Sequence, residues 1–241
     1  MAQTLVEPTL LFDFAITIAR LEVSSKKLGT KKSTSPKSTS PKPLMQTSRW
    51  QPKESNLIPH FAALSGGASN STVHAAWSEL GLYFAVDVMG KASPPRFVQA
   101  RGGFSDGLRI WIDTRCSPGI HRATRFCHCF HFFPGQANSS STSESGDLPR
   151  GILDEIPRAR EQPAKIVETD LHVESEFTRN GYTLWAHIPT DCLTGYSPLE
   201  FDRISIFYDV VDHELGTQSL TLGPELRYAE DPSLWVQAKL G

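Results

Sequence analysis

Apolar and polar side chains alternate in short stretches along most of the chain. Residues 8–23 show this pattern first, with small and polar side chains between the apolar ones. The apolar positions are Phe12, Phe14, Ile16 and Ile18. A period of two is typical of a β-strand with one buried face. The pattern therefore predicts a half-buried strand near the N-terminus.

The same pattern recurs from residue 44 to the end. It predicts strands over residues 80–88, 97–100, 108–113, 124–133, 166–177, 182–188, 203–211 and 234–240. Asn180-Gly181 is expected to supply the positive φ angles of a tight hairpin turn between two of these strands. Helical periodicity is nearly absent. Many short strands separated by turns predict an all-β domain, either a sandwich or a barrel.

Composition divides the chain into three parts. Residues 1–23 contain the N-terminal strand, which we expect to join the main domain. Residues 24–43 are nearly all Ser, Thr, Lys, Pro and Gly. Such a segment cannot bury a core, so it is predicted to be a flexible insert. Residues 44–241 form the β-sandwich domain.

Charge is distributed unevenly over the 241 residues, although the net charge is only −2. Residues 24–53 hold eight basic side chains and no acid, whereas residues 54–241 hold 15 basic and 23 acidic side chains. An acidic body repels phosphate instead of displacing its counterions. We therefore expect no nucleic-acid partner for the main domain.

Membrane and export signals are not recognisable in the N-terminal stretch. The apolar run over residues 9–19 is too short for a membrane span and contains Asp13. No basic region precedes it, as a secretory signal would require. Of the four cysteines, Cys127 and Cys129 stand two apart on an expected strand, which is poor disulfide geometry. We expect reduced thiols and a cytoplasmic protein with no membrane partner.

Four motifs together resemble carbohydrate-binding module family 9 and its DOMON-like relatives. Residues 106–113, DGLRIWID, are similar to the D-x-L-x-I-x-I-D strand of that family. The other three lie at residues 77–88, 181–189 and 203–212. Their order and spacing agree over residues 57–241, and residues 113–128 resemble an uncharacterised, planctomycete-like bacterial branch of the group.

The resemblance implies a jelly-roll-like antiparallel β-sandwich that binds a small ligand, which is a sugar in the best-known members. It implies no catalysis, because such modules serve an attached glycosidase, and it suggests a link to carbohydrate catabolism. Sugar-binding members hold a pyranose between two aromatic side chains. No such pair is assigned here from the sequence.

The strand over residues 108–113 offers the first candidate binding residues. Arg109, Trp111 and Asp113 alternate with three aliphatic side chains, so they should face away from the core. An exposed Trp between Arg and Asp is typical of a sugar-stacking platform. The alternative is that a loop or the N-terminal strand covers Trp111.

The segment from residue 115 to residue 131 offers the second set. It has no acidic residue between Thr114 and Thr142, inside an otherwise acidic domain. Its candidate ligand-binding residues are Arg115, His121, Arg122, Arg125 and His128. Because guanidinium groups match carboxylate and phosphate, a small anionic ligand is one hypothesis. The alternative is that these arginines pair with acids such as Asp106 and Asp113 and hold the loop.

Two kinds of metal site are conceivable, although in neither case do the ligand residues have the sequence spacing of a known metal-binding motif. A zinc site would draw on Cys116, His121, Cys127, His128, Cys129 and His131. A calcium site would draw on Asp87, Asp106, Asp113, Asp209 and Asp212, which stand near strand ends. The cofactor is therefore unassigned, with calcium the better fit of the two.

Two rival functions remain from the sequence. One is a hydrolase of glycosidic or other bonds that uses Ser105 or a carboxylate pair, since residues 103–107 match the G-x-S-x-G nucleophile elbow. That elbow requires a helix after the serine, whereas a strand is expected here. The other rival is a protein-interaction or structural domain without a small ligand, recruited through the basic insert.

Overall fold

The computed structural model describes residues 14–21, 49–60, 69–97, 105–136, 148–221 and 226–241. The predicted insert over residues 24–43 lies outside this part, as does most of the strand expected over residues 97–100. Regular structure in the described part is almost entirely β. The exceptions are four 3-10 turns, at Glu54–Asn56, Glu168–Asp170, Thr190–Cys192 and Pro232–Leu234.

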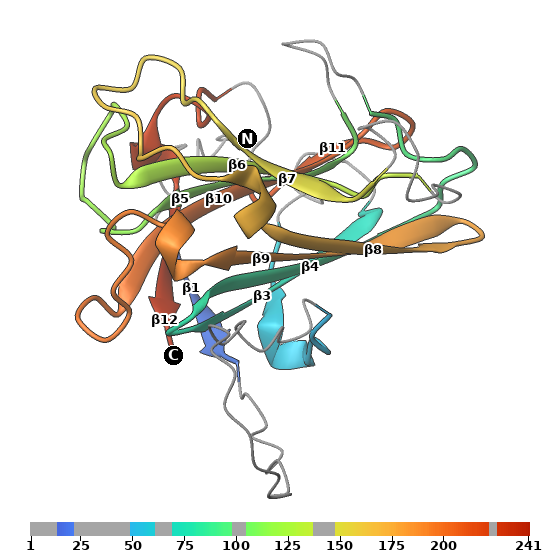
Figure 1. Cartoon of the computed structure of the whole chain (residues 1–241), viewed down its shortest axis with the longest axis horizontal. Coiled ribbons are helices and arrows are strands. Elements are labelled where there is room, and N and C mark those ends of the chain that lie inside the picture. Colours follow the sequence, from blue (N-terminus) through green and yellow to red (C-terminus); the bar gives the residue numbers. More distant parts are fainter. Residues whose placement is uncertain (1–13, 22–48, 61–68, 98–104, 137–147, 222–225) are drawn as a thin grey trace, which may run out of the picture.

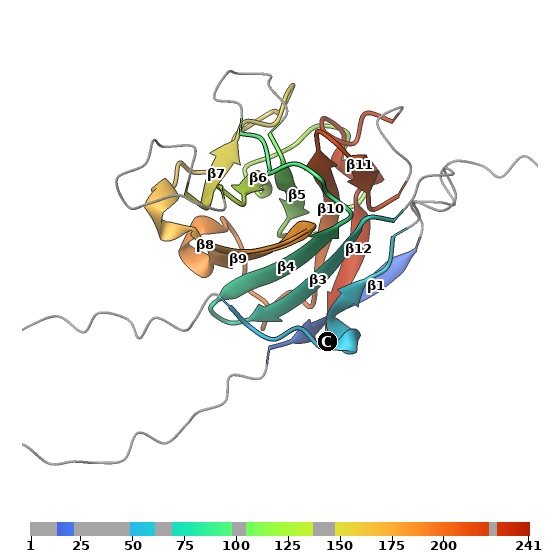
Figure 2. The same ribbon diagram turned by 90° about the vertical axis from the view of Figure 1, so that its right-hand side faces the viewer.

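The strands form two layers packed face to face (Figures 1 and 2). Sheet A has the order β7 (Arg150–Asp154), β6 (Cys127–Phe133), β5 (Gly107–Asp113), β10 (Arg203–Asp212) and β12 (Val236–Leu240). Sheet B has the order β8 (His172–Thr178), β9 (Gly181–Pro189), β4 (Gly81–Met89) and β3 (Ser71–Ser78). Two short strands lie off this path, with β11 (Gly216–Ser219) paired to β10 and β2 (Leu57–Ile58) paired to β3.

Strand β1 (Ala15–Arg20) connects the two sheets. Its residues 15–18 pair with β12 and its last two residues pair with β3. Figure 2 shows the layers meeting along this strand, so the sandwich is a nearly closed barrel on that side. Both pairings of β1 are parallel, whereas all other pairings are antiparallel among the described strands.

The core lies between the sheets and follows the predicted alternation. On β4 the inward residues are Leu82, Phe84, Val86 and Val88, all buried. Facing them, β5 contributes Leu108, Ile110 and Ile112, which are fully buried. Burial of alternate side chains on both layers fixes the register of each strand, because a slip by one residue would expose the whole apolar set. The predicted all-β sandwich is confirmed.

The hairpin between β8 and β9 forms as expected, although its turn works differently. Arg179 and Asn180 connect the strands, and neither Asn180 nor Gly181 has a positive φ. Gly181 is required for another reason. A Cβ there would lie 1.9 Å from the carbonyl oxygen of Val88 on the adjacent strand.

Candidate functional site

The outer face of sheet A carries the first candidate set. Arg109, Trp111 and Asp113 point away from the aliphatic side chains of β5, as the alternation predicts. Arg109 lies opposite Asp209 on β10 and opposite His131 on β6. The sheet therefore places a guanidinium, a carboxylate and an imidazole side by side on one face.

Arg109 is the accessible member of this group. Its side chain is 24% exposed, and an Nη atom lies 3.7 Å from Oδ2 of Asp209. The Asp209 carboxylate is fully buried and accepts hydrogen bonds from Ser219 Oγ at 2.7 Å and Tyr228 OH at 2.8 Å. Burial raises the pKa of Asp209, and these bonds together with Arg109 counteract that effect.

His131 completes the group. Its ring is buried, which lowers its pKa to about 3 with a further contribution from the Arg109 charge. Within the described part of the chain, its Nε2 atom is buried and has no hydrogen-bond partner. A buried polar atom without a partner costs free energy, so this position favours an additional donor or acceptor.

Trp111 is not a surface platform, and that prediction is wrong. Only 2% of the residue is exposed. Tyr228 covers it edge-on, with ring centroids 5.4 Å apart, and Tyr228 is itself held by a hydrogen bond from Trp235 Nε1 to its carbonyl oxygen at 2.7 Å. Residues 226–235 form the loop that covers Trp111. This agrees with the alternative interpretation, in which a loop or the N-terminal strand covers that side chain.

Asp113 and His128 are also buried, so neither can contact a ligand as predicted. The Asp113 carboxylate accepts the backbone N–H groups of Arg115 at 3.0 Å and Ser117 at 2.7 Å, and thereby shapes the loop after β5. His128 Nε2 accepts the Thr194 N–H at 3.0 Å. Burial lowers the pKa of His128 to about 4, which keeps the ring neutral.

The remaining candidates lie in the loop between β5 and β6. His121 contacts Asp231 at 3.1 Å, and Arg122 Nε donates to the Arg158 carbonyl at 2.8 Å. Arg115 and Arg125 stack on aromatic rings. In the described residues, none of the three arginines forms an ion pair with Asp106 or Asp113, although Arg122 does hold the loop through the Arg158 carbonyl. The eight predicted residues thus differ in burial, and two of them, Arg109 and Trp111, are in contact, with 5.6 Å between the guanidinium carbon and the ring centroid.

The cysteines and histidines proposed for zinc do not converge. Cys127 and Cys129 are buried within β6, and burial raises the pKa of both thiols, to about 11 for Cys127. Among the described residues, only Asp106, Asp212 and His213 bring three potential metal ligands within 4.8 Å of one another. The zinc set is therefore not supported.

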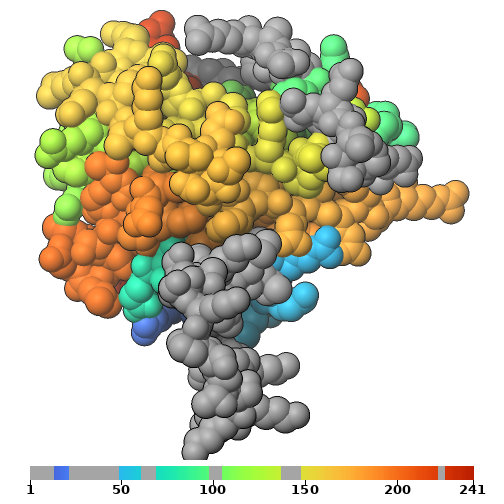
Figure 3. All heavy atoms as spheres, viewed as in Figure 1, coloured from blue at the N-terminus to red at the C-terminus, as the bar shows by residue number. Residues whose placement is uncertain are grey.

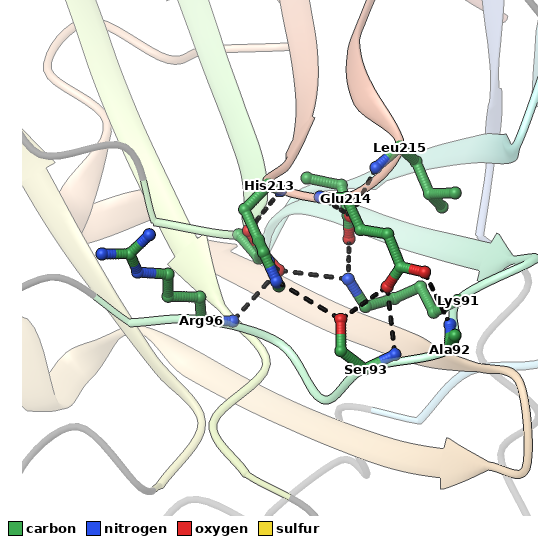
Figure 4. Close-up of polar contacts among 9 residues, drawn as sticks. Lys91, Ala92, Ser93, Arg96, His213, Glu214 and Leu215 are labelled. Carbon is green, nitrogen blue, oxygen red and sulfur yellow. Dashed lines mark hydrogen bonds and ion pairs between the residues drawn. The ribbon is translucent and has the colours of Figure 1, made fainter.

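A buried lysine already occupies that acidic cluster (Figure 4). Lys91 Nζ lies 2.5 Å from Asp212 Oδ2 and 3.3 Å from Asp106 Oδ2. Asp106 also accepts the Arg96 N–H at 3.0 Å and the His213 N–H at 2.8 Å. The ammonium supplies the positive charge that a cation would supply, so these residues do not fit calcium while Lys91 is in place.

Of the other oxygen donors proposed for calcium, each is engaged elsewhere. Asp87 accepts from Thr183 Oγ1 at 2.6 Å, Asp113 caps its loop, and Asp209 holds Ser219 and Tyr228. The sequence did not indicate Lys91 or His213. A lysine two residues after an apolar strand is so common at surfaces that it carries no signal of burial.

The hydrolase interpretation of Ser105 also fails. Ser105 is buried, and strand β5 begins two residues later, so the strand-to-helix elbow is missing. Residues 103 and 104 of the motif lie outside the described residues. No helix among the described residues is long and apolar enough to cross a membrane.

Comparison with solved structures identifies the fold. The chain superposes on a carbohydrate binding module family 9 from Caldicellulosiruptor kristjanssonii in complex with cellotriose, with a TM-score of 0.54 and 12% identity over 94% of this chain and 93% of that one. A family 9 module from the same organism in complex with glucose superposes with a TM-score of 0.48 and 13% identity, over 71% of this chain and 76% of that one. A putative carbohydrate-binding protein from Bacteroides uniformis superposes with a TM-score of 0.46 and 12% identity, over 76% of this chain and 94% of that one.

The fold is thus that of carbohydrate-binding module family 9, as the sequence motifs predicted. No protein family profile and no curated protein matches the chain. At 12% identity the similarity establishes the fold alone.

Proposed function

We propose that the chain is a non-catalytic carbohydrate-binding module that receives a neutral sugar on the outer face of sheet A, at Arg109. The observation that carries this proposal is the group formed by Arg109, Asp209 and His131. A partly exposed guanidinium stands 3.7 Å from the buried Asp209 carboxylate, which orients it on the rigid face of the sheet. Directed donors and acceptors of this kind recognise sugar hydroxyls.

The fold supports the same proposal. The structure that superposes over 94% of the chain is a module in complex with cellotriose. Binding on a rigid sheet face requires no chemistry, and the buried Ser105 supplies no nucleophile. A role in carbohydrate catabolism would follow if the module brings a sugar polymer to an enzyme. The four free cysteines fit a reducing, cytoplasmic setting. The DOMON-like and planctomycete-like relationships stay predictions.

Calorimetric titration of the full chain with cellotriose and with glucose tests the proposal. We expect saturable binding that Arg109→Gln weakens by roughly tenfold, equivalent to about 1.4 kcal/mol. The matched control is Arg179→Gln, an exposed arginine in the β8–β9 turn. Absence of saturable binding, or equal binding by Arg109→Gln, would overturn the proposal.

A further inference from the structure

Two aromatic rings and two guanidinium groups lie in contact at the end of sheet A where β5 ends and β6 begins. The Arg115 guanidinium carbon lies 4.0 Å from the ring centroid of Phe201 and 5.2 Å from that of Phe126. The Arg125 guanidinium lies 5.0 Å from the same Phe126 ring. We call these four residues the stacked-arginine patch.

The patch is held by the fold and is not a chance contact of mobile side chains. Thr114 Oγ1 donates to the Thr194 carbonyl at 2.7 Å, and the Thr194 N–H donates to buried His128 at 3.0 Å. These bonds fix the loop after β9 against the ends of β5 and β6. In Figure 3 the green segment around residue 120 and the orange segment around residue 200 lie side by side on the left edge.

Gly195 shows how closely the parts fit. A Cβ at this position would lie 2.6 Å from the Phe126 ring and 3.1 Å from Nε of Arg115. Gly195 also has a φ of +80°, which few other residues adopt without strain. The loop therefore approaches the stack at a residue without a side chain, and the stack is preorganised.

The charges of the patch are uncompensated in the described part of the chain. No carboxylate there forms an ion pair with Arg115 or Arg125, and the neighbouring Asp202 pairs with Arg203 at 3.8 Å. Glu200, the residue before Phe201, is exposed. Two guanidinium groups that lie close to one ring repel each other, so an anion bound at their N–H edges relieves the repulsion. Their N–H edges suit a planar carboxylate.

Apolar surface lies next to these charges. Phe201 is 39% exposed, and Leu199 is 79% exposed in the same loop. The free side of an aromatic ring packs well against the C–H face of a pyranose. A sugar that also carries a carboxylate would use both features at once.

We propose that the stacked-arginine patch binds a uronic acid residue of an acidic oligosaccharide, with Arg115 and Arg125 on its carboxylate and Phe201 against its ring. This proposal rests on the proposed sugar-binding function and extends it to a second site. Arg109 lies within strand β5, whereas Arg115 lies in the loop after it. A neutral sugar and a uronate would therefore contact different residues.

The test is a calorimetric titration of the full chain with trigalacturonate, carried out in about 50 mM and in about 300 mM NaCl. We expect binding that weakens at the higher salt, because the Debye length falls from roughly 14 Å to roughly 6 Å. Arg125→Gln, at an exposed position, should raise the Kd by roughly tenfold. Arg115→Gln should do the same, and Arg179→Gln should leave the Kd unchanged.

Further arms separate the other ligands. Arg109→Gln should keep trigalacturonate binding while weakening cellotriose binding, so failure of one site is distinguishable from failure of the other. Equal binding of sodium sulfate and trigalacturonate would show a general anion site and overturn the proposal. So would binding of a polyglutamate peptide in place of trigalacturonate, since a protein partner would then be favoured. Absence of trigalacturonate binding at low salt overturns it outright.

Discussion

The ammonium group of Lys91 lies 3.3 Å from the Asp106 carboxylate, and both side chains are almost completely buried. Together with Asp212, which Lys91 contacts at 2.5 Å, they join the segment after β4, the start of β5 and the end of β10. Glu214 extends the network at the surface. Hydrogen bonds from Ser93 and from the backbone N–H groups of Ala92 and Ser93 lower the pKa of Glu214 to about 2.

Lys91→Met should destabilise the fold by about 3–5 kcal/mol, because it leaves two buried carboxylates without a counter-charge. Urea unfolding followed by tryptophan fluorescence measures this. The double variant Lys91→Met/Asp212→Asn should recover part of the lost stability, because it removes the Asp212 charge that the single variant leaves buried without a counter-charge. Lys239→Met, at an exposed position on β12, should stay within about 0.5 kcal/mol of the parent protein. A loss below about 1 kcal/mol for Lys91→Met would contradict the network's role.

Stability should fall as the pH decreases from about 6.5 towards 4, in part because of His128. The pKa of its buried ring is about 4 in the folded chain, below the ordinary value of 6.5. The unfolded chain therefore binds more protons in this window, with a slope of up to about 1.4 kcal/mol per pH unit. Protonation would also abolish acceptance of the Thr194 N–H.

His128→Gln tests that assignment, because its amide oxygen can accept the same hydrogen bond without titrating. Thermal melts between pH 4 and 7 should show a shallower pH dependence for this variant. His187, whose pKa burial also lowers to about 4, contributes with the same sign and remains in both proteins. His121→Gln, at an exposed position, is the control. An unchanged slope in His128→Gln would refute the assignment.

The alternation of apolar residues was enough to predict the sandwich, because burial between two sheets acts on every second residue. It predicted β4, β5 and β10 closely. It missed β3, where Ala75 and Ala76 are both buried because each face of that strand is covered. A strand covered on both faces loses the period-two signal.

The candidate site was predictable only in part. Arg109 was found because it interrupts the apolar pattern of β5, and Asp209 interrupts β10 in the same way. Their pairing depends on register between strands 100 residues apart, which local sequence does not specify. Tyr228 and the cover it places over Trp111 come from a loop with no periodicity at all.

Trp111→Ala should therefore act on stability. Removal of a buried indole in contact with Tyr228 and Phe207 should cost about 3–5 kcal/mol in urea unfolding. Leu199→Ala is the matched control for an exposed apolar residue and should change stability by less than about 0.5 kcal/mol. A Trp111→Ala protein of full stability that failed only to bind sugar would restore the platform interpretation.

Gly107 explains why a glycine stands between Asp106 and strand β5. Its φ is +144°, and a Cβ there would lie 2.0 Å from the carbonyl oxygen of Phe132 on β6. Gly107→Ala must therefore push β5 and β6 apart, which also withdraws Asp106 from Lys91. Gly119 also has a positive φ, of +66°, but nothing lies within 4 Å of its would-be Cβ.

Gly107 combines crowding with a positive φ, whereas Gly119 has a positive φ alone, so Gly119→Ala is the reference for the backbone cost without crowding. Gly119→Ala should lower the free energy of unfolding only by the cost of placing an alanine in the left-handed region, about 1–2 kcal/mol. Gly107→Ala should lose clearly more, and hydrogen exchange should show reduced protection of the β5 and β6 amides. Equal losses in the two variants would mean that β6 yields to the added methyl group at no cost. The close approach of Gly107 to Phe132 would then not be what holds Asp106 beside Lys91.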